Sequence, residues 1–172
     1  KAFPAPRIAD LCSGSGCLPV VYSKEIIHVE EIVAVELSEQ ALPYLKKNVE
    51  QNDCRNVRVI HDDVLTWTPD TALHIISSNP PYLSDVEMQE LQKEVTFEPE
   101  MALLAPENGL YFYRILSQRY KDFLVSGGLL AFEVGWTQAK AVAALMEQNG
   151  YINIQILQDY GGNDRVVLGY KE

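Results

Sequence analysis

The sequence RIADLCSGSG at residues 7–16 joins a short apolar stretch to a glycine-rich loop. Small residues in such a loop let the backbone approach a ligand closely, and a following helix directs its N–H groups into the same space. The dinucleotide fingerprint GxGxxG would need a third glycine at position 19, where this chain has Pro19. The loop therefore disfavours a nicotinamide oxidoreductase and favours S-adenosylmethionine, a nucleotide-like cofactor without a pyrophosphate. A plain tight turn is the alternative interpretation.

Short stretches rich in Val, Ile and Leu recur along the chain and predict strands that are buried on both faces. They span residues Arg7–Leu11, Ile32–Glu36, Val57–His61, Leu73–Ser78, Leu129–Val134, Ile152–Gln158 and Arg165–Tyr170. Helical patterns between them indicate parallel strands with right-handed crossovers. The last two stretches are too close for a crossover helix, so they predict an antiparallel hairpin. We expect an α/β fold with a mostly parallel sheet of about seven strands that ends in this hairpin.

Three helical patterns have recognisable ends. They cover residues 38–52, with Ser38 as the cap, residues 110–124, which Gly127 and Gly128 would end, and residues 137–149, followed by Gly150. Pro43 is expected to disturb the first turn of the first helix. Prolines break residues 80–108 into loop and short helix, and we expect this segment to lie over the site rather than in the sheet.

Composition limits the class of protein. The 172 residues include 14 Lys and Arg against 24 Asp and Glu, a net charge of −10, which argues against direct contact with a nucleic-acid backbone. The length suits one domain, and 47% hydrophobic residues suit a packed globular chain. No apolar stretch approaches the ~20 residues that a membrane span needs, and no signal peptide is recognisable. Three cysteines without metal-ligand spacing argue against disulfides and zinc, and favour a reducing, cytoplasmic compartment.

Acidic residues follow the second and third predicted strands. Glu36 ends the second strand, 20 residues after Gly16, where a carboxylate can accept hydrogen bonds from both ribose hydroxyls of an adenosine. Asp62 and Asp63 follow the third strand, and one of them is a candidate acceptor for the adenine amino group. The alternatives are a surface carboxylate at a strand end for Glu36, and a helix cap or solvated turn for the two aspartates.

The tetrapeptide Asn79-Pro80-Pro81-Tyr82 follows the fourth strand, at the end where open α/β sheets bind ligands. A planar amide or nucleobase NH2 group is a poor nucleophile because its lone pair is delocalised. The Asn79 side-chain oxygen and the Pro80 carbonyl can each accept one of its N–H bonds and so fix the nitrogen beside a cofactor methyl group. Tyr82 would pack on the flat face of the substrate. A rigid proline turn is the structural alternative.

The motifs together resemble the HemK/PrmC family of S-adenosylmethionine-dependent protein-(glutamine N5) methyltransferases, which act on peptide chain release factors. Four segments carry the resemblance: DLCSGSG at 10–16, NPPY at 79–82, FEPEMAL at 97–103 and GGNDRV at 161–166. NPPY is shared with adenine and guanine amino-methyltransferases, whereas the last two segments narrow the family. A methyltransferase of an exocyclic amino group in DNA or RNA therefore remains the alternative function.

The resemblance implies a Rossmann-like class I methyltransferase domain over residues 1–172. By position, Cys12, Ser13, Gly14, Ser15 and Gly16 would line the methionine part of the cofactor, Glu36 the ribose, and Asp63 and Val64 the adenine. Asn79, Pro80, Pro81 and Tyr82 would bind the glutamine of a Gly-Gly-Gln motif, with Asn79, Pro80 and Tyr82 in the catalytic role and S-adenosylhomocysteine as the product. The family usually has Asp at the position of Glu36, and its members carry an upstream helical domain. Without that domain, this chain is expected to bind cofactor normally but methylate a release factor poorly.

Other residues suggest no chemistry. His28, His61 and His74 lack metal-ligand spacing, and Trp67 and Trp136 are interpreted as packing residues. Glu133 is as consistent with a structural carboxylate as with a functional one.

Overall fold

The computed structural model describes residues 3–89 and 100–172. These residues form one seven-stranded sheet in the order β3-β2-β1-β4-β5-β7-β6. The strands are β1 (Arg7–Leu11), β2 (Glu31–Glu36), β3 (Val57–His61), β4 (Leu73–Ser78), β5 (Leu124–Glu133), β6 (Tyr151–Gln158) and β7 (Asp164–Lys171). Strands β1 to β5 pair in parallel, and β7 is antiparallel to both β5 and β6. The predicted fold class, with its C-terminal antiparallel hairpin, is confirmed.

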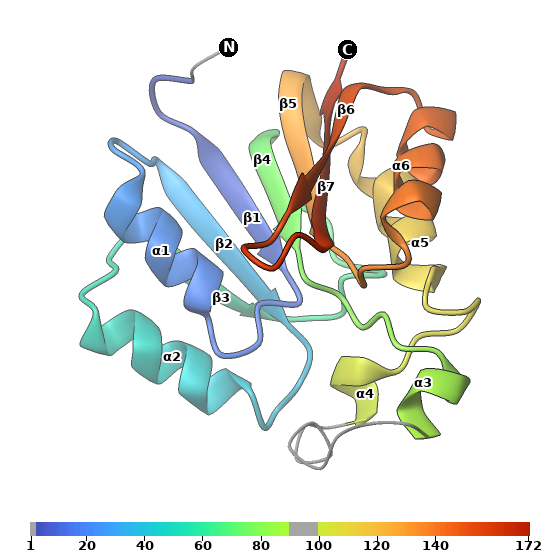
Figure 1. Cartoon of the computed structure of the whole chain (residues 1–172). Helices are drawn as coiled ribbons and strands as arrows, with labels where there is room; N and C mark the ends of the chain where they lie inside the picture. Colours follow the sequence, from blue (N-terminus) through green and yellow to red (C-terminus); the bar gives the residue numbers. More distant parts are fainter. Residues whose placement is uncertain (1–2, 90–99) are drawn as a thin grey trace.

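Helices cover both faces of the sheet (Figure 1). They are α1 (Cys17–Glu25), α2 (Leu42–Gln51), α3 (Asp85–Gln89), α4 (Glu100–Leu103), α5 (Tyr111–Tyr120) and α6 (Ala139–Gln148). Helices α1 and α2 lie on one face, α5 and α6 on the other, and α3 and α4 lie beyond the carboxyl ends of the parallel strands (Figure 1). As expected, the described part of residues 80–108 lies outside the sheet, where Leu83 bridges to Leu104. Residues 97–99 of the FEPEMAL motif lie outside the described residues.

The boundary between α5 and β5 differs from the prediction. Helix α5 ends at Tyr120 and β5 begins at Leu124, so Gly127 and Gly128 lie inside the strand instead of ending the helix. The pairing of β4 with β5 is irregular between Leu73 and Ile75, and Gly127 has a φ of 77°. A glycine with positive φ lets the strand bend at such an irregularity, which is why these glycines are compatible with a strand.

The predicted cap of the helix at residues 38–52 is also wrong. Helix α2 begins at Leu42, and Ser38 forms a turn before it, where its Oγ accepts a hydrogen bond from Ala41 N–H at 3.2 Å. Pro43 consequently lies in the first turn, where its missing N–H removes no helical hydrogen bond. The third helix agrees better with its prediction, since α6 is followed by Gly150 at a φ of 76°.

Packing of α2 against the glycine loop restricts one of the loop glycines. Gly16 has a φ of 87°, and a methyl group there would overlap Cδ1 of the buried Leu45. Gly14 also has a positive φ, of 54°, but a methyl group there would meet nothing within 4 Å. The two glycines share the left-handed conformation and differ in the space around them.

We predict that Gly16→Ala lowers the free energy of unfolding by about 2–4 kcal/mol, because the left-handed strain adds to overpacking against Leu45. Gly14→Ala should lose only the conformational part, about 1–2 kcal/mol. Urea unfolding of the two variants beside the parent chain measures the difference. Equal losses would show that the contact with Leu45 does not limit position 16.

Candidate functional site

The direction of the chain switches between β1 and β4, which are adjacent in the sheet. From β1 the chain continues to β2 on one side, and from β4 to β5 on the other. Leu11 pairs with Ser78, and the Ser78 Oγ donates a hydrogen bond to the Leu11 carbonyl at 2.9 Å. Open α/β sheets bind ligands in the crevice at such a switch point. The glycine loop and residues 79–82 emerge side by side there.

The glycine loop is a tight turn with three residues at positive φ: Cys12 at 60°, Gly14 at 54° and Gly16 at 87°. Ser13 anchors it, because its N–H donates to Val35 O at 3.1 Å and its carbonyl accepts from Gly16 N–H at 2.8 Å. Burial raises the pKa of the Cys12 thiol to about 12, so the thiol stays protonated at neutral pH. The open space above Gly14 is where the backbone can approach a ligand.

Glu36 ties the glycine loop to the end of β2. Its Oε2 accepts a hydrogen bond from Gly14 N–H and its Oε1 accepts one from Ser38 N–H, each at 2.7 Å. Only 8% of Glu36 is exposed. Each carboxylate oxygen has a further lone pair, so these contacts are compatible with the predicted role at a ribose. They also give Glu36 a positioning role that the sequence did not indicate.

Asp10 is a second buried carboxylate, which the sequence analysis did not select. It is 2% exposed within β1, and the Ser77 Oγ donates to its Oδ1 at 2.6 Å. Burial is the main cause that raises the pKa of Asp10 to about 7, and the nearby charge of Glu36 acts in the same direction. A carboxylate that interrupts an apolar strand directly before the glycine loop was the available signal.

The side chains of the acidic residues after β3 accept hydrogen bonds from the backbone of their own turn. Asp63 Oδ1 accepts a hydrogen bond from Leu65 N–H at 2.8 Å, and Asp62 Oδ1 accepts one from Asp63 N–H at 2.7 Å. Val64 is buried beside them. Asp62 N–H donates to Glu36 O at 3.2 Å, which places this turn next to the end of β2. The contact of Asp63 and Val64 with adenine stays a prediction.

Asn79 to Tyr82 leave the sheet at the end of β4. The Asn79 side chain is exposed, and no hydrogen bond from it to another described residue is found, whereas Pro80 and Pro81 are buried. Tyr82 is half-buried against the core, and its N–H donates to Leu103 O at 3.1 Å. The Asn79 side-chain amide thus faces solvent, while the residues after it are buried or hydrogen-bonded.

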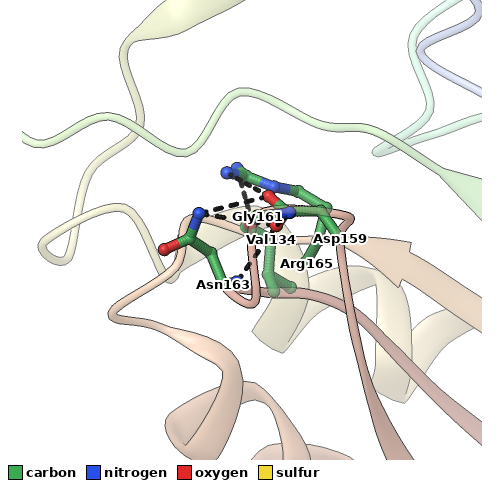
Figure 2. Close-up of polar contacts among 5 residues, drawn as sticks. All are labelled: Val134, Asp159, Gly161, Asn163 and Arg165. Atoms are coloured by element: carbon green, nitrogen blue, oxygen red, sulfur yellow. Dashed lines mark hydrogen bonds and ion pairs between the residues drawn. The ribbon is translucent and has the colours of Figure 1, made fainter.

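The hairpin turn between β6 and β7 lies at the same edge of the sheet, because β7 begins opposite the end of β5. Asp159 organises this turn by accepting hydrogen bonds from the N–H groups of Gly161 and Asn163 at 2.9 and 3.0 Å (Figure 2). Arg165 pairs with Asp159 at 3.5 Å and donates to Val134 O at 3.3 Å (Figure 2). The GGNDRV motif therefore fixes the turn to the end of β5.

The two tryptophans differ in their surroundings. Trp67 is 8% exposed and packs in the core, as predicted. Trp136 is 66% exposed in the turn that follows β5, so its interpretation as a packing residue is wrong. The turn is closed by Gln138 N–H, which donates to Gly135 O at 2.8 Å.

A family model described as methyltransferase small domain matches residues 1–135. The chain belongs to the methyltransferase small domain family. The domain is 34% identical over 168 residues to a release factor glutamine methyltransferase of Fusobacterium nucleatum, covering 96% of this chain and 47% of that protein. The corresponding protein of Francisella tularensis is 37% identical over 167 residues, covering 95% of this chain and 58% of that protein. These similarities confirm the resemblance drawn from the motifs. The chain spans about half the length of these relatives.

Solved structures agree with the fold. A methyltransferase of Pyrococcus furiosus has a TM-score of 0.73 at 16% identity, covering 97% of this chain and 75% of that one. A Streptococcus mutans protein solved in complex with SAH has a TM-score of 0.67 at 17% identity, covering 97% of this chain and 89% of that one. At these identities the similarity establishes the class I methyltransferase fold.

No three His, Cys, Asp or Glu side chains within residues 3–89 and 100–172 are grouped to hold a metal ion. No helix among those residues has the length and apolar character to span a membrane.

The raised pKa of Asp10 predicts a pH dependence of stability. Between about pH 4 and pH 7 the folded domain binds more protons at this carboxyl than the unfolded chain does, so the free energy of unfolding falls as the pH rises. Asp10→Asn removes this titration. We expect the parent domain to lose about 1–4 kcal/mol relative to Asp10→Asn across that window, because one pKa unit corresponds to about 1.4 kcal/mol. Urea unfolding at pH 4.5 and 7.5 measures this, and parallel changes in both proteins would contradict it.

Proposed function

We propose that this methyltransferase domain transfers a methyl group from S-adenosylmethionine to the side-chain amide nitrogen of the glutamine in the Gly-Gly-Gln motif of peptide chain release factors. The observation that carries the proposal is the position of Asn79-Pro80-Pro81-Tyr82 beside the glycine loop at the switch point of the sheet. The relatives named release factor glutamine methyltransferase support the choice of substrate.

Charge and open space at the switch point support S-adenosylmethionine as the cofactor. Open space above Gly14 leaves room for close approach to the backbone, and the buried Glu36 supplies carboxylate acceptors for ribose hydroxyls. Asp10, whose pKa is raised by burial, would be stabilised in its charged form by a nearby cation. S-adenosylmethionine carries a sulfonium and an ammonium group, and it supplies an electrophilic methyl group when bound.

In this proposal the domain acts mainly by positioning. Asn79 Oδ1 and the Pro80 carbonyl accept the two N–H bonds of the substrate amide, and Tyr82 packs on its face. Neither proline has an N–H group that would compete for these acceptors. A general base is not needed before attack, because the nitrogen becomes acidic once it carries the methyl group, and the proton can then leave to solvent beside the exposed Asn79.

The substrate and location follow from charge and chemistry. A net charge of −10 favours a protein substrate over a nucleic-acid backbone, and all three cysteines are free, which suits a reducing cytoplasm. We take residues 1–172 as one methyltransferase domain. Because the relatives are longer, we also propose that a further domain helps to hold the release factor.

The function is tested with radiolabelled S-adenosylmethionine and three acceptors: a release factor, the same factor with Ala in place of the glutamine of its Gly-Gly-Gln motif, and mixed DNA and RNA. We expect slow labelling of the first acceptor only, and micromolar or tighter binding of S-adenosylhomocysteine by calorimetry. Labelling of nucleic acid in place of the release factor would assign the domain to nucleobase amino groups. A domain that binds NADH in preference to S-adenosylhomocysteine would contradict the whole proposal.

Asn79 provides the sharpest test of the mechanism. Asn79→Ala removes one of the two acceptors for the substrate amide, so the rate of methyl transfer should fall by ~10²–10³, the usual loss for one well-placed transition-state contact. The exposed side chain makes the variant a mild one, and stability and affinity for S-adenosylhomocysteine should stay close to those of the parent. Single-turnover methylation measures the rate. Methylation at the parent rate would exclude the two-acceptor mechanism.

A further inference from the structure

Gln138 is a buried amide whose three hydrogen bonds all go to backbone atoms. It precedes α6 and is 8% exposed. Its Nε2 donates to Tyr82 O at 2.8 Å and to Asn108 O at 3.3 Å, and its Oε1 accepts from Gly135 N–H at 3.2 Å. Because two partners are carbonyls and the third is an N–H, the chemistry allows only this orientation of the amide.

These contacts join three segments that are far apart in the sequence. Tyr82 follows β4, Asn108 precedes α5, and Gly135 follows β5. A neutral amide has two donors and one strong acceptor group, and the site uses each of them. An apolar side chain of the same size would lose these part-buried hydrogen bonds to all three segments at once.

Two glycines make room for the amide. A methyl group at Gly109, which has a φ of 81°, would overlap the Tyr82 carbonyl oxygen and Gln138 Nε2. A methyl group at Gly135 would lie 2.8 Å from Gln138 Oε1 and 3.4 Å from Cδ2 of Tyr82. The close approach of Gln138 to Tyr82 is therefore supported by the residues on either side of it.

The segment from Asn79 to Tyr82 is held at both ends. At its start, Ser78 Oγ donates to Leu11 O at 2.9 Å within the sheet. At its end, Gln138 holds the Tyr82 carbonyl, while Leu103 O accepts from the N–H groups of Tyr82 and Leu83 at 3.1 and 2.8 Å. The two prolines between these anchors have fixed φ angles. The direction of the Pro80 carbonyl consequently depends on both anchors.

We infer that Gln138 is a positioning residue for methyl transfer. It holds the Tyr82 carbonyl and thereby orients the Asn79 side-chain oxygen and the Pro80 carbonyl, the two acceptors for the substrate amide. The inference rests on the proposed function of this segment. The side-chain hydrogen bonds of Gln138 go to Tyr82, Asn108 and Gly135 and not to the glycine loop or Glu36, so its effect should fall on the transfer step and leave cofactor binding unchanged.

The test compares two variants with a matched control. Gln138→Met keeps the size of the side chain and removes all three hydrogen bonds, whereas Gln138→Glu keeps an acceptor for Gly135 N–H and loses the donors to Tyr82 O and Asn108 O. Tyr151→Phe is the control, because the buried Tyr151 hydroxyl also donates to a backbone carbonyl, Ser117 O at 3.0 Å, but at the opposite end of α6 from Gln138. Each protein is assayed by calorimetry with S-adenosylhomocysteine and by single-turnover methylation of a release factor.

Amide hydrogen exchange provides a readout that is independent of activity. In both Gln138 variants we expect exchange at the Tyr82 and Leu83 amides to be at least tenfold faster, the transfer rate to be at least tenfold slower, and the affinity for S-adenosylhomocysteine to be within twofold of the parent. Tyr151→Phe should change each of these by less than twofold. Gly109→Ala should reproduce the faster exchange, since its methyl group would displace Gln138 from Tyr82.

Different results would contradict the positioning role of Gln138 and the proposed function. If Asn79→Ala stops methylation but the Gln138 variants transfer at the rate of the control, or if Tyr82 exchange is unchanged in both variants, the positioning role is wrong. If the parent domain binds no S-adenosylhomocysteine, the proposed function is wrong, and exchange at Tyr82 still decides whether Gln138 holds the segment. A Gln138→Met protein that does not fold leaves Gln138→Glu to decide both measurements.

Discussion

The parallel pairing of β1 with β4 is the constraint on which the site depends. It sets Leu11 beside Ser78, so the glycine loop and residue 79 must leave the sheet next to each other. Two serines fasten the ends of the strands, Ser77 to the Asp10 carboxylate at 2.6 Å and Ser78 to the Leu11 carbonyl at 2.9 Å. The chain continues from these two strands in opposite directions along the sheet, which is the arrangement that opens a crevice between their connections. The glycine loop and residues 79–82 therefore lie together, although the strands that lead into them are joined by a contact across 67 residues of sequence.

Two buried carboxylates give this site its charge. Asp10 and Glu36 are 2% and 8% exposed, and the charge of Glu36 helps to raise the pKa of Asp10. Desolvation would make such a pair costly if nothing compensated it. Glu36 is compensated by two backbone N–H groups, whereas Asp10 has a hydroxyl partner in Ser77 and keeps a pKa near neutrality. A ligand with positive charge would lower the electrostatic cost of the two buried carboxylates, whereas the negative charge of a dinucleotide pyrophosphate would raise it.

The sequence predicted those features that depend on local pattern. The apolar stretches located the strands, and the short spacing before Arg165 predicted the antiparallel hairpin. The start of β5 was missed because Gly127 and Gly128 are typical helix terminators, and only pairing with β4 explains their place in a strand. Ser38 was chosen as a cap because it precedes a helical pattern, although the chain uses it for a turn. Asp10 is visible in the sequence as a carboxylate within an apolar stretch, but its partner Ser77, 67 residues away, becomes apparent only in the fold.

Residues that would contact a ligand are also easier to predict from local sequence pattern than the residues that hold them in place. Gly14, Glu36 and Asn79 belong to short motifs whose composition suits the ligands proposed for them, so they stand out in the sequence itself. Gln138 lies at the start of an ordinary amphipathic helix, and its three partners come from segments that only the fold brings together. Proline-rich segments gain rigidity from fixed φ angles but lose the N–H groups that would anchor them. Their direction must then be set by contacts to their carbonyls, and a buried glutamine can supply such a contact while an unpaired charge cannot.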